Sequence, residues 1–153
     1  MGTQQILLIV LSVIIVGVAI AVGISMFNAQ SYNSNKTAIA ADAQSYATQI
    51  VQYYKTPVSQ GGGGNTLPTA DATGAALMGN AMGWDGATIT NDNGTYTLAI
   101  TTTGAPGVAT ITGVGTSEKT KSTVKYVPQI LTTVTFPAGT ITTVASDEEV
   151  SGT

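Results

Sequence analysis

The sequence contains no cysteine, no histidine and no arginine, and its five lysines and eight acidic residues give a net charge of −3 over 153 residues. Without histidine or cysteine there is no imidazole base, no thiolate nucleophile and no zinc site built on nitrogen or sulfur ligands. Five lysines in an acidic chain do not create the positive field that binding to a phosphate backbone requires. We therefore expect no enzymatic activity, no cofactor and no nucleic-acid partner.

Charged side chains are also missing from the N-terminal part of the chain, where the first is Lys36. The 22 residues from Ile6 to Phe27 are apolar or small apart from two serines, and as a helix they would span about 33 Å, enough to cross the apolar core of a bilayer. A cleaved secretory signal is disfavoured because Met1–Gln5 carries no side-chain charge and the run is too long. A plain membrane anchor fits the length, although no lysine or arginine immediately flanks the run to set its orientation.

Residues 28–56 continue the helical period, but as an amphipathic pattern. Its apolar stripe consists of Tyr32, Ile39, Ala43, Tyr46, Ile50 and Tyr53. No proline or glycine interrupts the pattern before Pro57, so we expect one helix over residues 1–56, ending near Lys55. A folded domain is needed only under the second half. The first half, apolar on all sides, must be buried in lipid or against copies of itself.

This start and continuation resemble the mature N-terminus of type IV pilins and related pseudopilins, with archaeal pilins and flagellins a close alternative. The resemblance lies in the short polar start Met1–Gln5, the aliphatic run to Gly23 and the amphipathic half that follows. It implies a structural subunit of an extracellular filament on the cell surface, formed from copies of the chain. It also implies residence in the inner or cytoplasmic membrane before assembly, and a prepilin-type assembly machinery that removes a short leader. The alternative is a monomeric, membrane-anchored binding domain of the cell surface.

The resemblance also implies which residues act in assembly. Pilins usually have a glutamate at the position matching Gln5, if Met1 is the first mature residue, and it is thought to meet the N-terminal amine of a neighbour. Gln5 cannot neutralise that amine, so Gln4 and Gln5 together would supply a neutral substitute. The expected assembly residues are Met1, Gln4, Gln5, Ile6, Leu7, Ile9, Val10, Val13, Ile14, Gly17, Ile20, Gly23 and Phe27.

Two glycines in the apolar run, Gly17 and Gly23, allow two interpretations. Glycine in an apolar helix permits close packing of neighbouring helices. The segment Val13–Gly23 is also dense in β-branched residues, which are weak helix formers, and filaments of the family often unwind near this place. We therefore expect non-helical backbone within this segment of the assembled form.

The remaining residues predict a loop region over 57–86 and a sheet over 87–153. Ser59–Asn65 is a flexible, glycine-rich breaker, and a short helix is expected within Ala70–Met82. Four to five antiparallel strands are expected at Thr95–Thr101, Gly107–Val114, Thr123–Val127, Ile130–Phe136 and Thr140–Val144. Their inner face would pack on the helix stripe. The predicted fold class is α+β, a long N-terminal helix on a small antiparallel sheet.

Several polar residues of the chain allow two interpretations each. Asp85, Asp92 and Asn93 are either calcium ligands or, because no loop motif matches, ordinary turn residues. The acidic segment Asp147–Glu149 is either a solvated tail or a partner for a lysine of another subunit. Asn35 and Asn93 each begin an N-glycosylation pattern. Trp84 is expected in the core of the head or at a contact between subunits.

Overall fold

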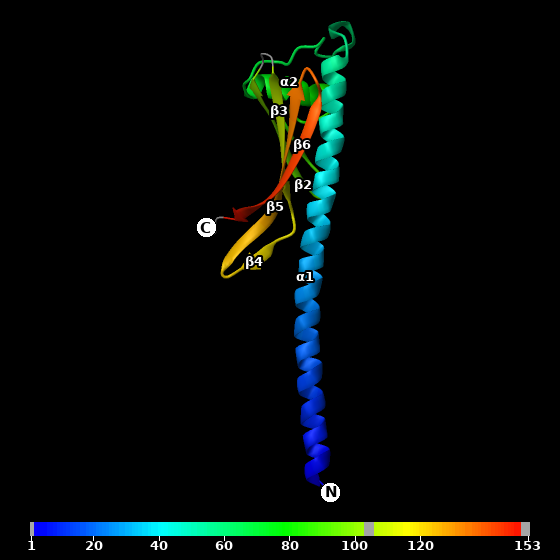
Figure 1. Cartoon of the computed structure of the whole chain (residues 1–153), viewed down its shortest axis with the longest axis vertical. Helices are drawn as coiled ribbons and strands as arrows, with labels where there is room; N and C mark the ends of the chain where they lie inside the picture. Colours follow the sequence, from blue (N-terminus) through cyan, green and yellow to red (C-terminus); the bar gives the residue numbers. More distant parts are fainter. Residues whose placement is uncertain (1, 103–105, 151–153) are drawn as a thin grey trace.

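The computed structural model describes residues 2–102 and 106–150, which form a long rod with a head on one end (Figure 1). The rod is helix α1, which runs without interruption from Gly2 to Lys55, 54 residues. At a rise of 1.5 Å per residue such a helix is about 80 Å long. The head packs on its second half only, and the first half projects alone. The predicted single helix and its end at Lys55 are confirmed.

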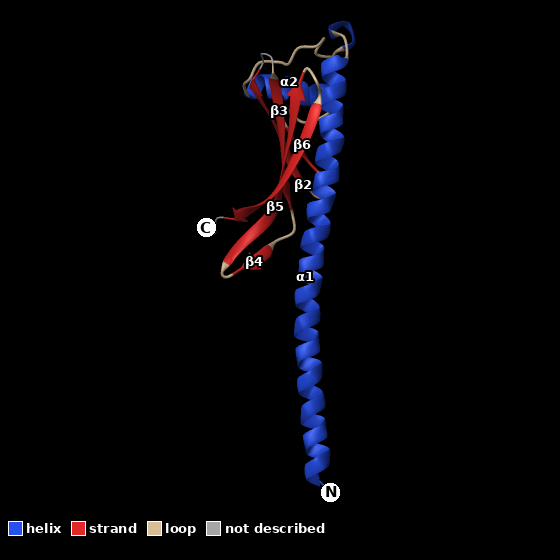
Figure 2. Ribbon diagram, in the orientation of Figure 1, coloured by secondary structure: helices blue, strands red, loops and turns tan. Residues whose placement is uncertain are grey.

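The head consists of two short helices and a six-stranded antiparallel sheet (Figure 2). The strand order is β1-β2-β3-β5, with β6 on the other side of β5 and β4 pairing the beginning of β5. The predicted α+β class and the short helix are confirmed. The elements after α1 are η1 (Val58–Gln60), α2 (Ala72–Ala81), β1 (Thr88–Thr90), β2 (Gly94–Thr102), β3 (Gly107–Gly115), β4 (Lys119–Lys121), β5 (Val124–Phe136) and β6 (Thr140–Val150).

Strand β5 corrects one prediction. The sequence predicted two strands, one before and one after Pro128, and the structure has a single strand there. On one side of β5, β4 pairs up to Tyr126 and β3 pairs from Gln129 onwards. Pro128 therefore lies at the change of partner on that side. The ladder is already interrupted there, so a missing backbone N–H is tolerated.

Strand β6 corrects a second prediction, because it continues through the acidic segment to Val150 instead of ending at Val144. The three acidic residues are held in register opposite Tyr126, Val127 and Pro128 of β5. The segment is thus the end of an edge strand, although it remains exposed to solvent as predicted for a tail. Strands β1 and β4 were not predicted, because three-residue polar strands carry no period that a sequence pattern can reveal.

The core of the head lies between α1 and the inner face of the sheet. The buried side chains of α1 are Tyr32, Ile39, Ala43, Ala47, Ile50 and Tyr54. Tyr46 and Tyr53, which the stripe predicted as buried, are half-buried and pack at its margin. A 3.6-residue period falls between spacings of three and four, so the phase of the stripe drifted by one residue. Alanines on this face let the sheet approach closely, and Tyr54 stacks on Phe136 with ring centroids 4.2 Å apart.

The glycine-rich run after α1 is a boundary, as predicted, but it is not a free linker. Its backbone N–H groups donate to carbonyls of the last helical turn, from Gly63 to Tyr53 at 2.8 Å and from Asn65 to Tyr54 at 2.8 Å. Carbonyls that a helix end leaves without partners are satisfied in this way. A Cβ at Gly62 or Gly63 would collide with backbone atoms of Thr56 or Thr66, so the run needs its glycines to close over the helix.

Candidate functional site: the apolar rod and its junction with the head

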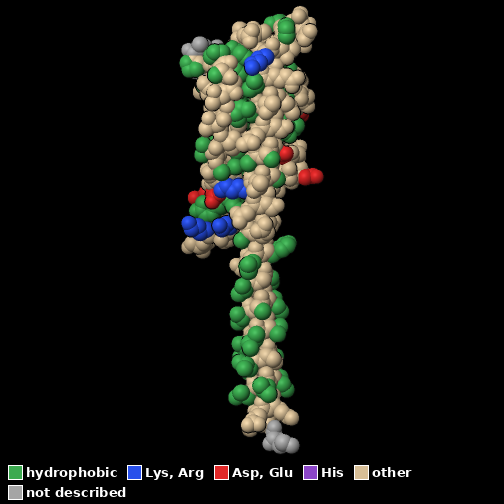
Figure 3. All heavy atoms as spheres, turned by 45° about the vertical axis from the view of Figure 1, so that its right-hand side comes forward, with side chains coloured by type: hydrophobic (Ala, Val, Ile, Leu, Met, Phe, Trp, Pro, Cys, Tyr) green, Lys and Arg blue, Asp and Glu red, His purple; other side chains and the backbone are tan. Residues whose placement is uncertain are grey.

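The first half of α1 carries a continuous apolar surface that nothing in the described part of the chain covers. Sixteen large apolar side chains between Ile6 and Phe27 are each 50% to 74% exposed. Consecutive positions from Ile6 to Leu11 are all exposed and apolar, so this surface goes round the helix, and Figure 3 shows one face of it. Soluble monomers rarely expose contiguous apolar patches larger than a few hundred Å². This surface is therefore the candidate site for contact with lipid or with another protein.

The predicted assembly residues lie on this rod wherever the structure describes them. The aliphatic members are all exposed, Gln4 and Gln5 lie exposed near the tip, and Met1 is outside the described residues. Apart from the adjoining helix backbone, no atom of the described residues comes within 4 Å of a Cβ placed at Gly17 or Gly23, so both positions are open to a neighbour. The helix is continuous through Val13–Gly23 in this single chain. The predicted unwinding concerns the assembled form and stays a prediction.

By length and composition, α1 is also the one helix of the described residues that meets the requirements for crossing a membrane. Its most apolar window has a mean hydropathy of 3.2, and none of that window is buried within the chain. A signal sequence passes the same test, and so does the core helix of a soluble protein. The length and composition of α1 are therefore compatible with two states of this helix: one in which lipid surrounds it and one in which other protein covers it.

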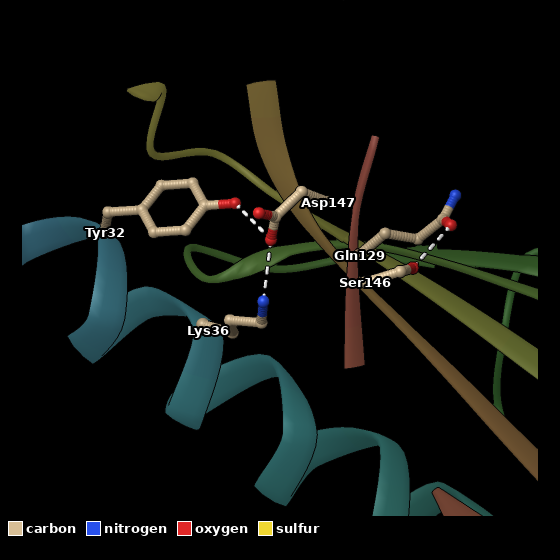
Figure 4. Close-up of polar contacts among 5 residues, drawn as sticks. All are labelled: Tyr32, Lys36, Gln129, Ser146 and Asp147. Carbon is tan, nitrogen blue, oxygen red and sulfur yellow. Dashed lines mark hydrogen bonds and ion pairs between the residues drawn. The ribbon is translucent and has the colours of Figure 1, made fainter. Parts of the chain in front are cut away.

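At the boundary between the exposed first half of α1 and the half that the head covers, Asp147 of β6 joins the sheet to α1 (Figure 4). Its Oδ1 accepts a hydrogen bond from the Tyr32 hydroxyl at 2.8 Å and forms an ion pair with Lys36 Nζ at 2.7 Å. The hydrogen bond from Lys36, then that from Tyr32, lowers the pKa of the Asp147 carboxyl. Burial of Tyr32 and its bond to Asp147 raise the pKa of the phenol. The three side chains clamp the end of an edge strand to the helix.

We expect Asp147→Ala to loosen β6 without unfolding the head. Lys36 and Asp147 are partly exposed, and exposed ion pairs contribute about 1 kcal/mol or less, so global stability should hardly change. Local opening should increase, because the end of β6 would then be held by β5 alone. Hydrogen exchange of the β6 amides after Val144 should accelerate several-fold. Glu149→Ala, an exposed acidic residue of the same strand, is the matched control and should leave these rates unchanged; equal rates in both variants would contradict the clamp.

A second junction lies higher on α1, at Asp42. Its Oδ2 accepts hydrogen bonds from Tyr96 OH at 2.7 Å, Asn93 Nδ2 at 2.8 Å and Asn91 Nδ2 at 3.0 Å. Burial opposes ionisation, but the three hydrogen bonds together outweigh it and lower the pKa of the carboxyl. Tyr96 is fully buried, and its ring packs edge-on against Tyr46. Asp42 thus fixes the turn before β2 against the helix.

The turn that contains Asp92 and Asn93 is held together by its own polar groups. Asn91 Oδ1 accepts hydrogen bonds from the backbone N–H groups of Asn93 and Gly94, which is the geometry of an Asx turn. The side-chain Nδ2 of Asn93 donates to Asp42 and its backbone carbonyl accepts from Asn35, so these groups of Asn93 hold the turn against the helix. Among the described residues no group of three or more acidic side chains is arranged to hold a metal ion.

Asn35 and Asn93, which begin the two glycosylation patterns, are half-buried where α1 meets the head. Asn35 Nδ2 donates to the Asn93 carbonyl at 2.7 Å, and Asn35 Oδ1 accepts from the Ser117 N–H at 3.2 Å. Asn93 Nδ2 is bonded to Asp42. A glycan on either amide nitrogen would have to displace one of these contacts, and glycosylation of both residues stays a prediction. Trp84 is 5% exposed and packs edge-on against Tyr46 at 5.0 Å, which confirms its expected place in the core.

Both junctions escaped the sequence analysis, because each joins residues that are far apart in the chain. Tyr32 was predicted only as an apolar member of the stripe, and no role was predicted for Asp42. One signal for Asp42 was available in the sequence: its carboxylate lies one position before Ala43, a member of the predicted buried stripe. The comparisons add no further information: no protein-family model matches the chain, and neither the curated proteins nor the solved structures contain a significant match.

Proposed function

We propose that this protein is a structural subunit of an extracellular filament similar to a type IV pilus. The subunits associate through the apolar rod, residues 6–27, which forms the filament core, while the heads form the outer surface. The observation that supports this proposal is the exposure of sixteen large apolar side chains on a rigid helix whose other half is buried in a folded head. Before assembly the same rod resides in a membrane.

The free energy available from covering the rod is large. At about 25 cal/mol per Å², burial of half the surface of a 22-residue apolar helix yields on the order of 10 kcal/mol before the entropy costs of association. Because the rod is apolar on every side, each subunit can be covered by several neighbours at once. A contact between different faces of identical subunits propagates and generates a helical polymer.

The length that favours a filament also fits a monomeric membrane anchor, which is the second proposal. The two differ in what they require of α1. An anchor needs an apolar span of about 20 residues and any connection to its domain. A filament spine uses one rigid helix that holds the head at a fixed distance from the core. The continuity of α1 from Gly2 to Lys55 supports the filament.

Electron cryomicroscopy of filaments sheared from the producing cells, with mass spectrometry of the same preparation, tests the proposal. We expect this chain to form an ordered helical polymer with residues 6–27 at its axis and the heads outside. Recovery of the chain only as a detergent-extracted monomer would favour the anchored domain. A filament whose axis is formed by the heads would exclude both arrangements.

The same map tests the expected unwinding of α1. We expect at least one turn of non-helical backbone within Val13–Gly23 in the filament, because β-branched residues and Gly17 weaken the helix there and neighbouring subunits compensate for lost hydrogen bonds. Hydrogen exchange of the detergent-solubilised single chain is the control, and it should show protected amides throughout the segment. An unbroken hydrogen-bond ladder through the segment in the filament would contradict the prediction.

A further inference from the structure

The base of the head carries opposite charges on opposite edges of the sheet. In the described part of the chain, β4 and β6 each pair with β5 alone and flank it on its two sides. Lys119 and Lys121 lie on β4, and Glu148 and Glu149 lie on β6, all four of them exposed. Lysine side chains gather visibly at this end of the head (Figure 3).

The two edges lie at the same level along the molecule. Lys119 and Glu149 are both paired with Tyr126, so the three residues form one row across the sheet. Residues directly opposite each other on neighbouring strands point to the same face. Lys119 points to the helix side, where its Nζ lies 5.6 Å from the centre of the Tyr32 ring, and Glu149 therefore shares that side.

These four charges form no ion pair within the described part of the chain, although Lys119 lies over the Tyr32 ring and Glu148 accepts a hydrogen bond from Gln129 Nε2 at 2.9 Å. The ion pairs of the described residues join Lys36 to Asp147 and Lys125 to Glu118. They leave Lys119 and Lys121 on one edge and Glu148 and Glu149 on the other without an ion-pair partner among those residues. Within one chain, two strand spacings of about 4.8 Å keep the Cα atoms of Lys119 and Glu149 about 9.6 Å apart, with β5 between them.

We propose that the lysine edge of one subunit contacts the glutamate edge of the next, so that ion pairs between heads set how the subunits are arranged around the filament. The partner is a second copy of this chain, and the inference rests on the proposed filament function. Strands β4 and β6 are both antiparallel to β5 and hence parallel to each other. Subunits that point in the same direction can therefore bring one edge to the other without inverting either copy.

The geometry of the contact suits a polymer better than a dimer. Two different patches meet, so each subunit keeps one free patch of each kind and the contact repeats. In a shared row, Glu149 of one copy lies on the same face as Lys119 of its neighbour, as in a cross-strand pair of opposite charge. Because these ion pairs are exposed, each contributes little to the cohesion of the filament and is weakened by salt. Their effect is on which arrangement of the subunits forms. The apolar rods supply most of the cohesion.

Cysteine cross-linking tests this contact directly, because the natural chain has no cysteine. In Lys119→Cys/Glu149→Cys filaments, we expect mild oxidation to produce ladders beyond the dimer on non-reducing gels. A disulfide needs Cα atoms within about 7 Å, so the two sites cannot react within one chain and each cross-link joins two subunits. Lys55→Cys/Asp85→Cys, exposed positions on neither edge, is the control and should give no ladder. Ladders absent from intact double-cysteine filaments, or dimers from Glu149→Cys alone, would overturn the proposal.

Charge reversal gives a second, independent measurement. Lys119→Glu/Lys121→Glu and Glu148→Lys/Glu149→Lys should each reduce sedimentable filament at least ten-fold at low salt, and the quadruple variant should restore it. Circular dichroism melting of each variant identifies any that fail to fold, and the cross-linking result then decides. If the unaltered chain forms no filament, the proposed function fails. If it forms filaments and both reversals assemble normally, only this inference fails.

Discussion

Replacing Ile14 by aspartate should abolish filament formation while leaving the head folded. Ile14 lies in the middle of the apolar rod and is 57% exposed in the single chain. In an apolar filament core, an isolated carboxylate costs several kcal/mol, and every subunit would carry one. We expect at least a hundred-fold loss of filaments, scored by electron microscopy and by sedimentation of the sheared fraction. The melting temperature of the head should be unchanged.

The control for this experiment is Ile14→Leu, which keeps the volume and the apolar character of the side chain and should assemble almost normally. A variant that carries aspartate and still assembles at the natural yield would show that the rod is not buried in the polymer. The amount of folded chain in the membrane fraction should be measured in parallel, because a charge within the rod also weakens membrane insertion. Loss of filaments with retention of membrane-bound chain isolates the effect on assembly.

Replacing Asp42 of α1 by alanine should cause a larger loss of stability than any other single substitution of a polar residue at the contact between the helix and the head. The change removes the common acceptor of Tyr96, Asn91 and Asn93, and the Tyr96 hydroxyl is left in a fully buried side chain. A buried donor without a partner costs about 1 to 3 kcal/mol. We expect a decrease of about 3 kcal/mol in the free energy of unfolding, measured by denaturant titration of the full chain in detergent. Asp92→Ala, in the same turn but exposed, should cost less than about 0.5 kcal/mol.

The same residue predicts how stability depends on pH. Asp42 lies outside the apolar rod, and its pKa is lower in the folded chain than the usual value of about 3.9 for an unfolded aspartate. Its contribution is therefore fully present above about pH 4 and is lost as the pH falls through the folded pKa. Asp147 acts in the same direction, with a smaller effect because it is more exposed. A head that lost no stability on acidification below pH 4 would contradict this assignment.

The rod and the sheet could be predicted because their residues repeat at the period of the element that they form. The change from an apolar to an amphipathic helix near Phe27, the end at Lys55 and the strands around Leu98 and Ile111 all follow from period and turn residues. The sequence predicted Tyr53 on the buried stripe, whereas its neighbour Tyr54 is the buried residue, because a 3.6-residue period falls between spacings of three and four. These elements are local in origin, so the sequence contains the information directly.

The junctions could not be predicted, because they depend on which strands become neighbours. Asp147 meets Lys36 across a separation of 111 residues, and no local pattern links an acidic segment to one lysine of a helix. Strand β4 exists only because the beginning of β5 offers it a free ladder beyond the end of β3. The opposed charges of the two edges appear only when β4 and β6 are placed on either side of β5. Long-range pairing decides all three.

The way the head is attached to α1 determines how it would respond to a pull. Strands β5 and β6 run alongside the helix rather than across it (Figure 1). Tension along the rod therefore loads their ladder in shear, and the eleven residue pairs between β5 and β6 must yield together instead of opening one after another. The loop over the end of α1 joins the rod to the head at the far end, so force enters the sheet from its remote side. In a fibre built from such subunits, a pull along the rods would therefore meet the heads in the direction in which their longest ladder resists it most.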